Sequence, residues 1–354
     1  MNFIKKENTI RCSIENIIEK QIPKNAVILF GILNWGLGHA SRSLPLIKLL
    51  QQKGHNVHVV SDGLPIEWLK KEIPDVVFHK MNPSFFVYPT SYMWLNVMMM
   101  FPRFVKFVLD NKKYAELLAH STGANVLISD NRFGFRCSDI ALNIYITHQI
   151  SIHHKHSFLQ KILSKAHQYF IKKYDFCWVP DSRDNPLAGK LSSSSGIKNI
   201  FYLGNLSRLS AENTSLKKYD ILILLSGPEP QRSYFEENIL RTINHFNDKN
   251  ICLVRGTTKP LLFDSDAIKT IIHLADTPTL QKVIEESELI ICRSGYSTIM
   301  DLDQFDKKVI FVPTPGQTEQ EYLAFYHSSK NVNYFIIKQN EIFKNLPYLI
   351  NKLL

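Results

Sequence analysis

A chain of 354 residues with 45% hydrophobic and 21% charged residues is long enough for two globular domains of ordinary size. The net charge of +10 lies in residues 1–200, which carry 25 basic and 14 acidic residues, whereas residues 201–354 carry 17 and 18. Five scattered cysteines, odd in number and without a CxxC pair, argue against a disulfide framework or a zinc site. We therefore expect a cytoplasmic protein with reduced thiols.

Strand and helix patterns alternate along the chain after a short N-terminal extension, residues 1–24, which lacks the apolar core of a signal peptide. Strands are predicted at Ala26–Ile32, Asn56–Ser61, Val76–His79, Asn125–Ser129, Ile144–His148, Phe176–Pro180, Ile200–Leu203, Ile221–Ser226, Ile251–Arg255, Thr270–Leu274, Leu289–Cys292 and Val309–Pro313. Two successive series of this kind predict an α/β fold of two Rossmann-like parallel-sheet domains. We expect a first domain at 25–203, a hinge at 204–215 and a second domain at 216–354. The last helix could pack back on the first domain.

The first predicted strand runs into the Gly-rich segment LNWGLGHASRS. There Gly36 and Gly38 let the backbone turn sharply and approach a ligand, in a loop that begins near Asn34. The pattern is close to a dinucleotide fingerprint, and Asp62 follows the second strand where a ribose-binding acid would lie. However, Ser41 stands in place of the third glycine, so the fingerprint is weak evidence.

His39 begins the helix after this loop and is a candidate general base. The positive end of the helix dipole lowers the pKa of a histidine at this place, which favours the neutral, proton-accepting form. The alternative is that His39 only caps or packs the helix start. His148, at the carboxyl end of the fifth predicted strand, is the second candidate.

Two segments of the first half suggest a membrane surface. The most apolar stretch, Thr90–Phe101, is too short to span a bilayer; it is either a buried helix or a segment that dips into a membrane surface. Residues 153–175 space lysines with aromatic residues in a helical pattern. This suits an anionic membrane surface, or equally a solvated helix face.

In the second half, CRSGYSTIMD, residues 292–301, passes from a strand through a tight turn into a helix. Such a helix N-terminus can receive a phosphate, and Asp301, one turn further on, could accept hydrogen bonds from a ribose. The alternative is an ordinary β-α turn capped by Ser294 or Ser297.

Other polar groups follow neighbouring strand ends. The segment LLSGPEPQR offers backbone N–H groups at Ser226 and Gly227 and ends at Arg232. With Arg208 in the hinge and Arg293 beside the CRSGYSTIMD turn, these groups could neutralise a pyrophosphate without a metal.

A metal site is the alternative, because Asp264 and Asp266, and also Asp301 and Asp303, form DxD patterns like those of metal-dependent sugar transferases. Helical residues two apart point about 200° from each other, so Asp301 and Asp303 cannot share one ion. The other pair falls in a predicted loop. We expect no metal and no other cofactor.

Four segments in a fixed order resemble the motifs of the family 28 glycosyltransferases: NWGLGHA, LGNLSR, CRSGYSTIMD and VPTPGQTEQEY. The best-known member adds N-acetylglucosamine to the lipid-linked peptidoglycan precursor. The resemblance implies a GT-B fold, in which two Rossmann-like domains face each other across a cleft. It also implies that the second domain binds most of a nucleotide sugar and the first binds the acceptor.

By position, the resemblance implies that Asp301 binds the ribose, that the backbone near Leu274 reads the uracil, and that His39 faces the acceptor hydroxyl. Gln320 and Glu321 would contact the ribose or the sugar. With the loops above, the predicted donor site comprises Arg208, Ser226, Gly227, Arg232, Leu274, Arg293, Ser294, Gly295, Ser297, Thr298, Asp301, Gln320 and Glu321. Asp301 and Glu321 replace the family's usual Glu and Gln, and the second change leaves the donor sugar open.

We therefore expect an inverting, metal-independent transfer from a UDP-sugar, with UDP-N-acetylglucosamine the first choice. The basic first half suggests a lipid-linked or lipopolysaccharide-type acceptor at the inner membrane face. A UDP-sugar epimerase of the same fold is the nearest alternative. An NAD-dependent oxidoreductase leaves the second-half motifs unexplained. A non-catalytic nucleic-acid-binding protein fits the pI of 9.2 but predicts basic residues in both halves.

Overall fold

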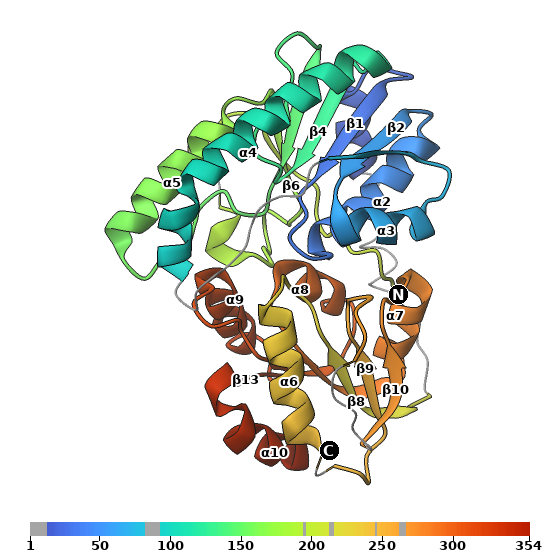
Figure 1. Ribbon diagram of the computed structural model, residues 1–354, viewed down its shortest axis with the longest axis vertical. Coiled ribbons are helices and arrows are strands. Elements are labelled where there is room, and N and C mark those ends of the chain that lie inside the picture. The colour runs from blue at the N-terminus through green and yellow to red at the C-terminus, as the bar shows by residue number, and fades with distance from the viewer. Residues whose placement is uncertain (1–12, 82–92, 194–195, 212–215, 245, 262–266) are drawn as a thin grey trace. The chain divides into compact units, whose positions relative to one another are not determined.

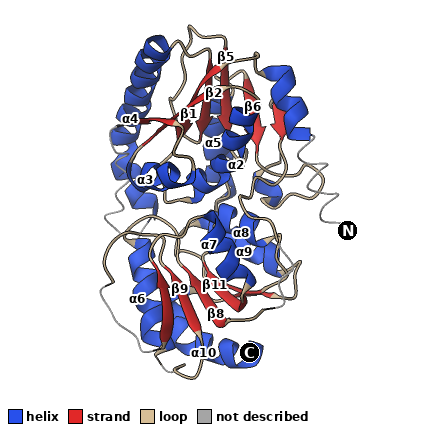
Figure 2. Ribbon diagram, turned by 90° about the vertical axis from the view of Figure 1, so that its right-hand side faces the viewer, coloured by secondary structure: helices blue, strands red, loops and turns tan. Residues whose placement is uncertain are grey.

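A computed structural model of the protein describes residues 13–81, 93–193, 196–211, 216–244, 246–261 and 267–354. The chain divides into two compact units, each built on its own parallel sheet (Figures 1 and 2). The first consists mainly of residues up to Leu206, and the second of Ser207–Leu354. The predicted fold of two Rossmann-like parallel-sheet domains is confirmed.

The first unit contains seven parallel strands in the order β3-β2-β1-β4-β5-β6-β7. They are β1 (Val27–Ile32), β2 (Asn56–Ser61), β3 (Val77–Lys80), β4 (Val126–Asp130), β5 (Leu142–Ile146), β6 (Phe176–Val179) and β7 (Ile200–Tyr202). β4 and β5 are buried at every residue. Strands buried along their whole length are expected where helices cover both faces of a sheet.

The helices of the first unit are α2 (Gly38–Gln52), α3 (Gly63–Glu72), α4 (Met93–Thr122) and α5 (Ser157–Ile171), with a 3-10 turn η1 (Gly189–Leu191). Residues 13–21, within the predicted extension, are also helical. They bury Ile14 and Ile18, and Gln21 accepts a hydrogen bond of 2.8 Å from the Trp178 indole. The extension therefore packs as part of the first unit.

Of the apolar stretch Thr90–Phe101, residues 90–92 lie outside the described residues and the rest begin α4. No helix in the described part of the chain is long and apolar enough to cross a membrane.

The second unit contains six parallel strands in the order β10-β9-β8-β11-β12-β13. They are β8 (Tyr219–Leu224), β9 (Ile251–Val254), β10 (Ile268–Ile272), β11 (Ser287–Cys292), β12 (Lys308–Phe311) and β13 (Tyr334–Ile336). The helical elements are α6 (Gln231–Ile243), α7 (Thr277–Glu285), α8 (Tyr296–Leu302), α9 (Thr318–Ser328), η2 (Gln339–Glu341) and α10 (Ile342–Leu353). Sequence reasoning missed β13, the last strand of this sheet.

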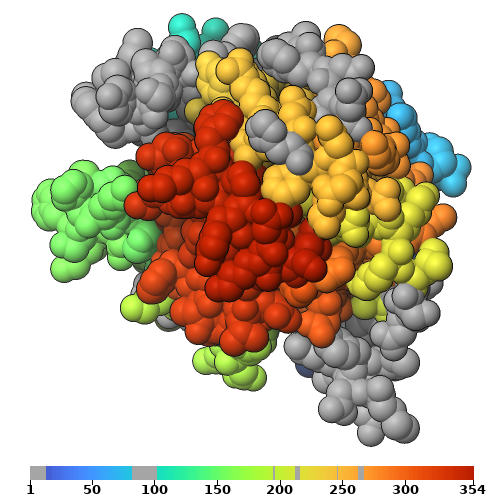
Figure 3. Space-filling model, turned by 90° about the horizontal axis from the view of Figure 1, so that it is seen from below, coloured from blue at the N-terminus to red at the C-terminus, as the bar shows by residue number. Residues whose placement is uncertain are grey.

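The last helix, α10, uses its apolar face within its own unit. Ile342, Leu346 and Ile350 recur every four residues and join the core that contains Ile239 and Ile243 of α6. Figure 3 shows the red C-terminal residues beside the yellow residues of α6. These contacts lie within the second unit, and packing of this helix on the first domain stays a prediction.

The strand orders fix where ligands can bind. In each sheet the order reverses between two central strands, β1 and β4 in the first unit and β8 and β11 in the second. Loops that leave such a pair diverge to opposite faces, and open α/β sheets bind ligands in the crevice this creates at the carboxyl ends. The predicted His39 loop follows β1, and the CRSGYSTIMD turn follows β11.

Candidate functional site

The first group of polar residues lies beyond β1 and β4. His39 is in the first turn of α2, and Asp130 is the last residue of β4. The His39 Nδ1 atom lies 2.9 Å from Asp130 Oδ1, and the side chains are 12% and 0% exposed. A histidine near the surface is thus held by a fully buried carboxylate.

Two further side chains of α2 reach the same carboxylate. Ser43 Oγ donates to Asp130 Oδ2 at 2.8 Å, and Arg42 donates through Nε to Oδ2 at 2.9 Å and through Nη2 to Oδ1. The three α2 residues are spaced three and four apart, so they share one helix face. Burial opposes ionisation of Asp130, but the Arg42 and His39 interactions outweigh it and hold its pKa well below the usual range.

His39 Nδ1 faces two groups that favour different tautomers. Asp130 Oδ1 belongs to an ionised carboxylate, which only accepts, whereas Arg42 Nη2, 2.9 Å from Nδ1, only donates. Because Nη2 also donates to Asp130 Oδ1, we assign the Nδ1 proton to the Asp130 contact, which leaves the lone pair of the neutral ring on Nε2. Burial and the Arg42 charge lower the pKa of His39, against the opposing influence of Asp130. The residue is equipped as a general base.

His148 has a different environment. Its Nδ1 atom lies 2.8 Å from Arg42 Nη1, and its residue is 5% exposed. A guanidinium can only donate, so His148 accepts through Nδ1 and helps to orient Arg42. Of the two candidate bases, His39 is the one whose Nδ1 faces a carboxylate.

The Gly-rich loop has its own internal contacts. Gly36 has a φ of +74°, in the region that favours glycine. Asn34 Nδ2 donates to Asp62 Oδ1 at 2.7 Å, and Arg132 Nη1 donates to Asp62 Oδ2 at 3.0 Å. Asp62 and Arg132 are fully buried as an ion pair. Asp62 is therefore occupied within the fold, which removes the ribose contact that motivated the NAD-dependent oxidoreductase.

In the second unit, the two motifs VPTPGQTEQEY and CRSGYSTIMD meet at neighbouring strands. Ser294 Oγ, after β11, donates to the Gln320 backbone oxygen on α9 at 2.8 Å. The Gln320 side chain accepts from Thr314 N at 2.9 Å, and Glu321 accepts from Gly316 N at 3.3 Å. Both side chains thus shape the loop after β12. Gly295 precedes α8, whose first residues include Ser297 and Thr298.

Asp301 and Arg208 lie in the same unit. Asp301 is near the end of α8 and 7% exposed, and its Oδ1 accepts from Ser207 Oγ at 2.6 Å. Arg208 Nη1 donates to Thr277 Oγ1, at the start of α7, at 3.2 Å. The residues at the start of this unit thereby contact α8 and the turn that follows Leu274. The structure brings Asp301, Arg208 and Leu274, three predicted donor residues, to the carboxyl side of the second sheet.

The prediction that Arg293 offers a cation to a pyrophosphate needs correction. This residue is 1% exposed and donates to the Val312 backbone oxygen at 2.9 Å and to Gln339 Oε1 at 2.6 Å. Its guanidinium also lies 4.1 Å from the Phe235 ring centroid. Burial lowers the pKa of Arg293 to about 9. The side chain supports the loop from inside the unit.

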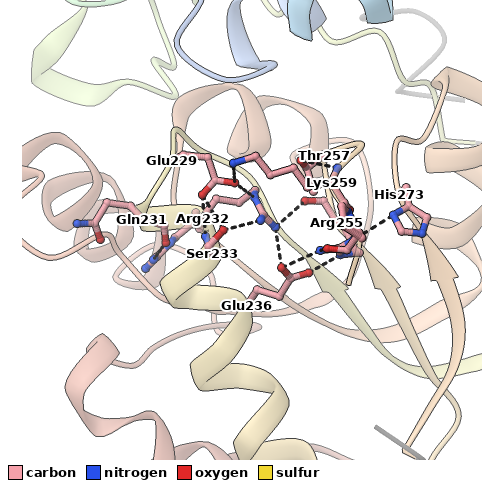
Figure 4. A network of polar contacts seen from close by, with 11 residues as sticks. Glu229, Gln231, Arg232, Ser233, Glu236, Arg255, Thr257, Lys259 and His273 are labelled. Carbon is pink, nitrogen blue, oxygen red and sulfur yellow. Dashed lines mark hydrogen bonds and ion pairs between the residues drawn. The ribbon is translucent and has the colours of Figure 1, made fainter. Parts of the chain in front are cut away.

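Arg232 is corrected for a similar reason. It is 3% exposed and donates through Nε to Glu229 Oε1 at 2.9 Å and through Nη1 to Glu236 Oε2 at 3.0 Å (Figure 4). Two carboxylates compensate this cation. Glu229 lies three residues before Arg232 and Glu236 four residues after it, which is the spacing of side-chain ion pairs on a helix. Sequence reasoning could have used this signal. Ser226 and Gly227 follow β8 as predicted, and Gly227 has a φ of +107°.

The two DxD patterns and one further group bear on the metal alternative. Asp264 and Asp266 lie outside them, and Asp301 is buried while Asp303 is exposed. One group, His120, Cys137 and Asp139, could present three ligand atoms within 4.8 Å of one another. His120 lies in the last turn of α4, and the other two residues precede β5, which puts the group at the amino edge of the first sheet, opposite His39.

Sequence reasoning missed Asp130 and Arg42. Asp130 ends the strand that begins with the apolar run Val126–Ile128, and Arg42 is one helical turn after His39. A carboxylate at the carboxyl end of a predicted strand was the available signal.

Comparison with known proteins agrees with this geometry. Residues 256–354 match the model of the glycosyltransferase family 28 C-terminal domain, and no curated protein sequence matches the chain. Among solved structures it is similar to the glycosyltransferase of kitacinnamycin, with 13% identity and a TM-score of 0.62 over 94% of this chain and 91% of that one. The calicheamicin glycosyltransferase CalG4 has 12% identity and a TM-score of 0.62 over 94% and 90%.

Acinetobacter baumannii MurG has 13% identity and a TM-score of 0.55 over 92% of this chain and 90% of that one. At such identities the likeness establishes the fold, which is GT-B. The predicted resemblance to family 28 is confirmed by the match in the second unit. The family match and the fold together support a glycosyltransferase.

Proposed function

We propose that this chain, which carries a family 28 glycosyltransferase C-terminal domain on a GT-B fold, transfers a sugar from a UDP-sugar to an acceptor hydroxyl with inversion at the anomeric carbon. The observation that carries the proposal is the His39–Asp130 pair at the switch point of the first sheet. A neutral histidine held by an ionised carboxylate suits a step in which a hydroxyl must lose its proton. UDP-N-acetylglucosamine is the donor we test first.

The second unit provides groups for the nucleotide. Asp301 offers a carboxylate for the ribose hydroxyls, and the backbone near Leu274 is available to the uracil. Arg208 and the backbone N–H groups of the turns at Gly227 and Gly295 supply positive charge for the diphosphate. We propose that this charge replaces a metal ion in the reaction.

The proposed reaction is a single displacement. His39 Nε2 takes the proton from the acceptor hydroxyl as its oxygen forms a bond to the anomeric carbon. The bond from that carbon to the β-phosphate oxygen breaks on the opposite side, and UDP leaves with the electron pair. Asp130 stabilises the imidazolium that forms, and Arg42 keeps the carboxylate ionised. Preorganised charges of this kind are often the largest catalytic contribution.

The surface of α5 supports an acceptor that resides in a membrane. Its exposed apolar residues recur on one side of the helix, and no acidic residue occurs in it. The exposed apolar residues are Phe158, Leu159, Ile162, Leu163 and Tyr169. Lys161 and Lys165 flank them, and each basic residue near an anionic surface contributes about 1 kcal/mol. We propose peripheral contact with the inner face of the cytoplasmic membrane and a lipid-linked or lipopolysaccharide-type acceptor.

UDP release tests the proposal directly. The purified chain is incubated with a panel of UDP-sugars, with and without a bacterial lipid extract. Release of UDP that needs the extract supports transfer, and the productive sugar identifies the donor. Interconversion of UDP-sugars without an extract would show the epimerase instead. Loss of turnover on adding EDTA would refute the metal-free step.

A further inference from the structure

A buried arginine holds an exposed histidine where two neighbouring strands of the second sheet end (Figure 4). Arg255 directly follows β9 and is 1% exposed, while His273 directly follows β10 and is exposed. Arg255 Nη1 lies 3.0 Å from His273 Nδ1. Both residues therefore lie at the carboxyl edge, where this unit is proposed to bind the nucleotide.

The other contacts of Arg255 fix its guanidinium in place. Nε and Nη2 donate to the two Glu236 carboxylate oxygens at 2.5 and 3.0 Å, a bidentate pair. Nη1 also donates to the Lys259 backbone oxygen at 2.6 Å, and Nη2 to that of Pro260 at 3.2 Å. Arginine has five N–H donors, and with His273 each has one acceptor here. Because all five donors are used, these contacts hold the guanidinium in one orientation.

This arrangement determines the tautomer of His273. A guanidinium only donates, so His273 Nδ1 accepts and the neutral ring carries its proton on Nε2. Figure 4 shows this second nitrogen on the side of the ring away from Arg255. The His273 backbone is also held, because its oxygen accepts from Thr257 N at 3.0 Å. The result is a fixed N–H donor beside Leu274.

We propose that His273 determines base specificity by donating a hydrogen bond from Nε2 to the O4 keto oxygen of uracil. Arg255 is then the residue that positions His273. The inference rests on the proposed function, because it deepens the account of the same donor site. Cytosine carries an amino group where uracil has the O4 oxygen, so it would leave two donors facing each other. A bound base covers the His273 N–H, and a covered donor without an acceptor costs about 1–3 kcal/mol. We therefore expect UDP to bind about 10- to 100-fold more tightly than CDP.

Titration calorimetry with UDP and CDP tests this inference. His273→Ala should reduce the UDP preference to within about threefold of unity, while His273→Gln, which keeps an N–H donor at similar reach, should retain most of it. Lys259→Ala is the matched control, since this exposed side chain lies on the loop that Arg255 holds through its backbone. It should keep the wild-type preference.

The outcomes separate two failures. If the wild-type protein binds UDP and His273→Ala keeps the full preference over CDP, the role of His273 is refuted and the proposed function stands. If the wild-type protein binds neither nucleotide, the proposed function is refuted as well. Arg255→Gln should lower the UDP preference in protein whose circular dichroism spectrum is unchanged. An unchanged preference in that variant would refute the positioning role.

Discussion

The Nδ1 atom of His39 lies 2.9 Å from Oδ1 of Asp130, although 91 positions separate the two residues in the sequence. β1 and β4 are neighbours at the centre of the first sheet, so the loop after one strand meets the end of the other. A buried carboxylate thus orients a histidine at a switch point, where an open α/β sheet has room for a ligand. The proposed chemistry depends on this pair.

Replacing His39 with Ala should lower kcat by about 10²–10⁴ and leave the donor KM within about threefold, because general base assistance acts in the transition state. Initial rates of UDP release measure both constants. His120→Ala is the control, since this exposed histidine lies at the opposite edge of the same sheet. Full kcat in the His39 variant would exclude it as the base.

The pH dependence of kcat should have an acid limb below the ordinary histidine pKa of about 6.5. Burial and Arg42 lower the pKa of His39, so its base form persists into more acidic solution. Asp130 acts in the opposite direction. Asp130→Asn should therefore move the acid limb to still lower pH, while kcat on the plateau falls about 100-fold. A limb that moves to higher pH would contradict this electrostatic account.

The strands were predictable because parallel sheets bury both faces, which leaves apolar runs such as Leu289–Cys292 in the sequence. Alternation with helices then gave the two-domain fold. It also placed the His39 loop and the CRSGYSTIMD turn after the carboxyl ends of strands, which is the edge where parallel sheets bind ligands.

Partners distant in sequence were not predictable. Arg293 was read as a free cation, yet its acceptors belong to Val312 and Gln339, which only the folded unit brings to it. Asp130 was missed for the same reason, because nothing local to residue 130 shows that β4 lies beside β1. A motif indicates which loop binds, whereas the contacts that each side chain makes in the folded unit decide whether it can face a ligand.

Glu236 should be important for stability, since its carboxylate faces both Arg232 and Arg255. Glu236→Gln removes the charge partner of the buried Arg255 and leaves Arg232 with Glu229 alone, which we expect to cost about 3–5 kcal/mol. Glu237→Gln, one residue along, breaks an exposed pair with Arg241 and should cost less than about 1 kcal/mol. Urea unfolding followed by circular dichroism compares the two. Equal losses would show that the Glu236 network contributes no more than a surface pair.

Asp301→Asn should weaken UDP binding by about tenfold, because it replaces an ionised acceptor with a neutral amide at the proposed ribose contact. Asp303→Asn is a close control, since this residue is two positions away and exposed. Ser207→Ala removes the hydroxyl that donates to Asp301 and should have a smaller effect. Titration calorimetry with UDP gives all three constants. Equal binding by the two Asp variants would exclude Asp301 from the ribose contact.

The α5 surface should determine membrane binding. Lys161→Gln with Lys165→Gln should weaken association with anionic vesicles by about 30-fold, as expected for two lysines at about 1 kcal/mol each. Phe158→Ser with Ile162→Ser removes apolar contacts and should weaken it even at low salt. Val332→Ser is the control, because Val332 is the most exposed large apolar residue among the described residues of the second unit. Flotation with anionic and zwitterionic vesicles measures binding. If both double variants float like the wild type, the α5 surface does not determine membrane binding. A membrane acceptor must then reach the His39 loop without help from α5.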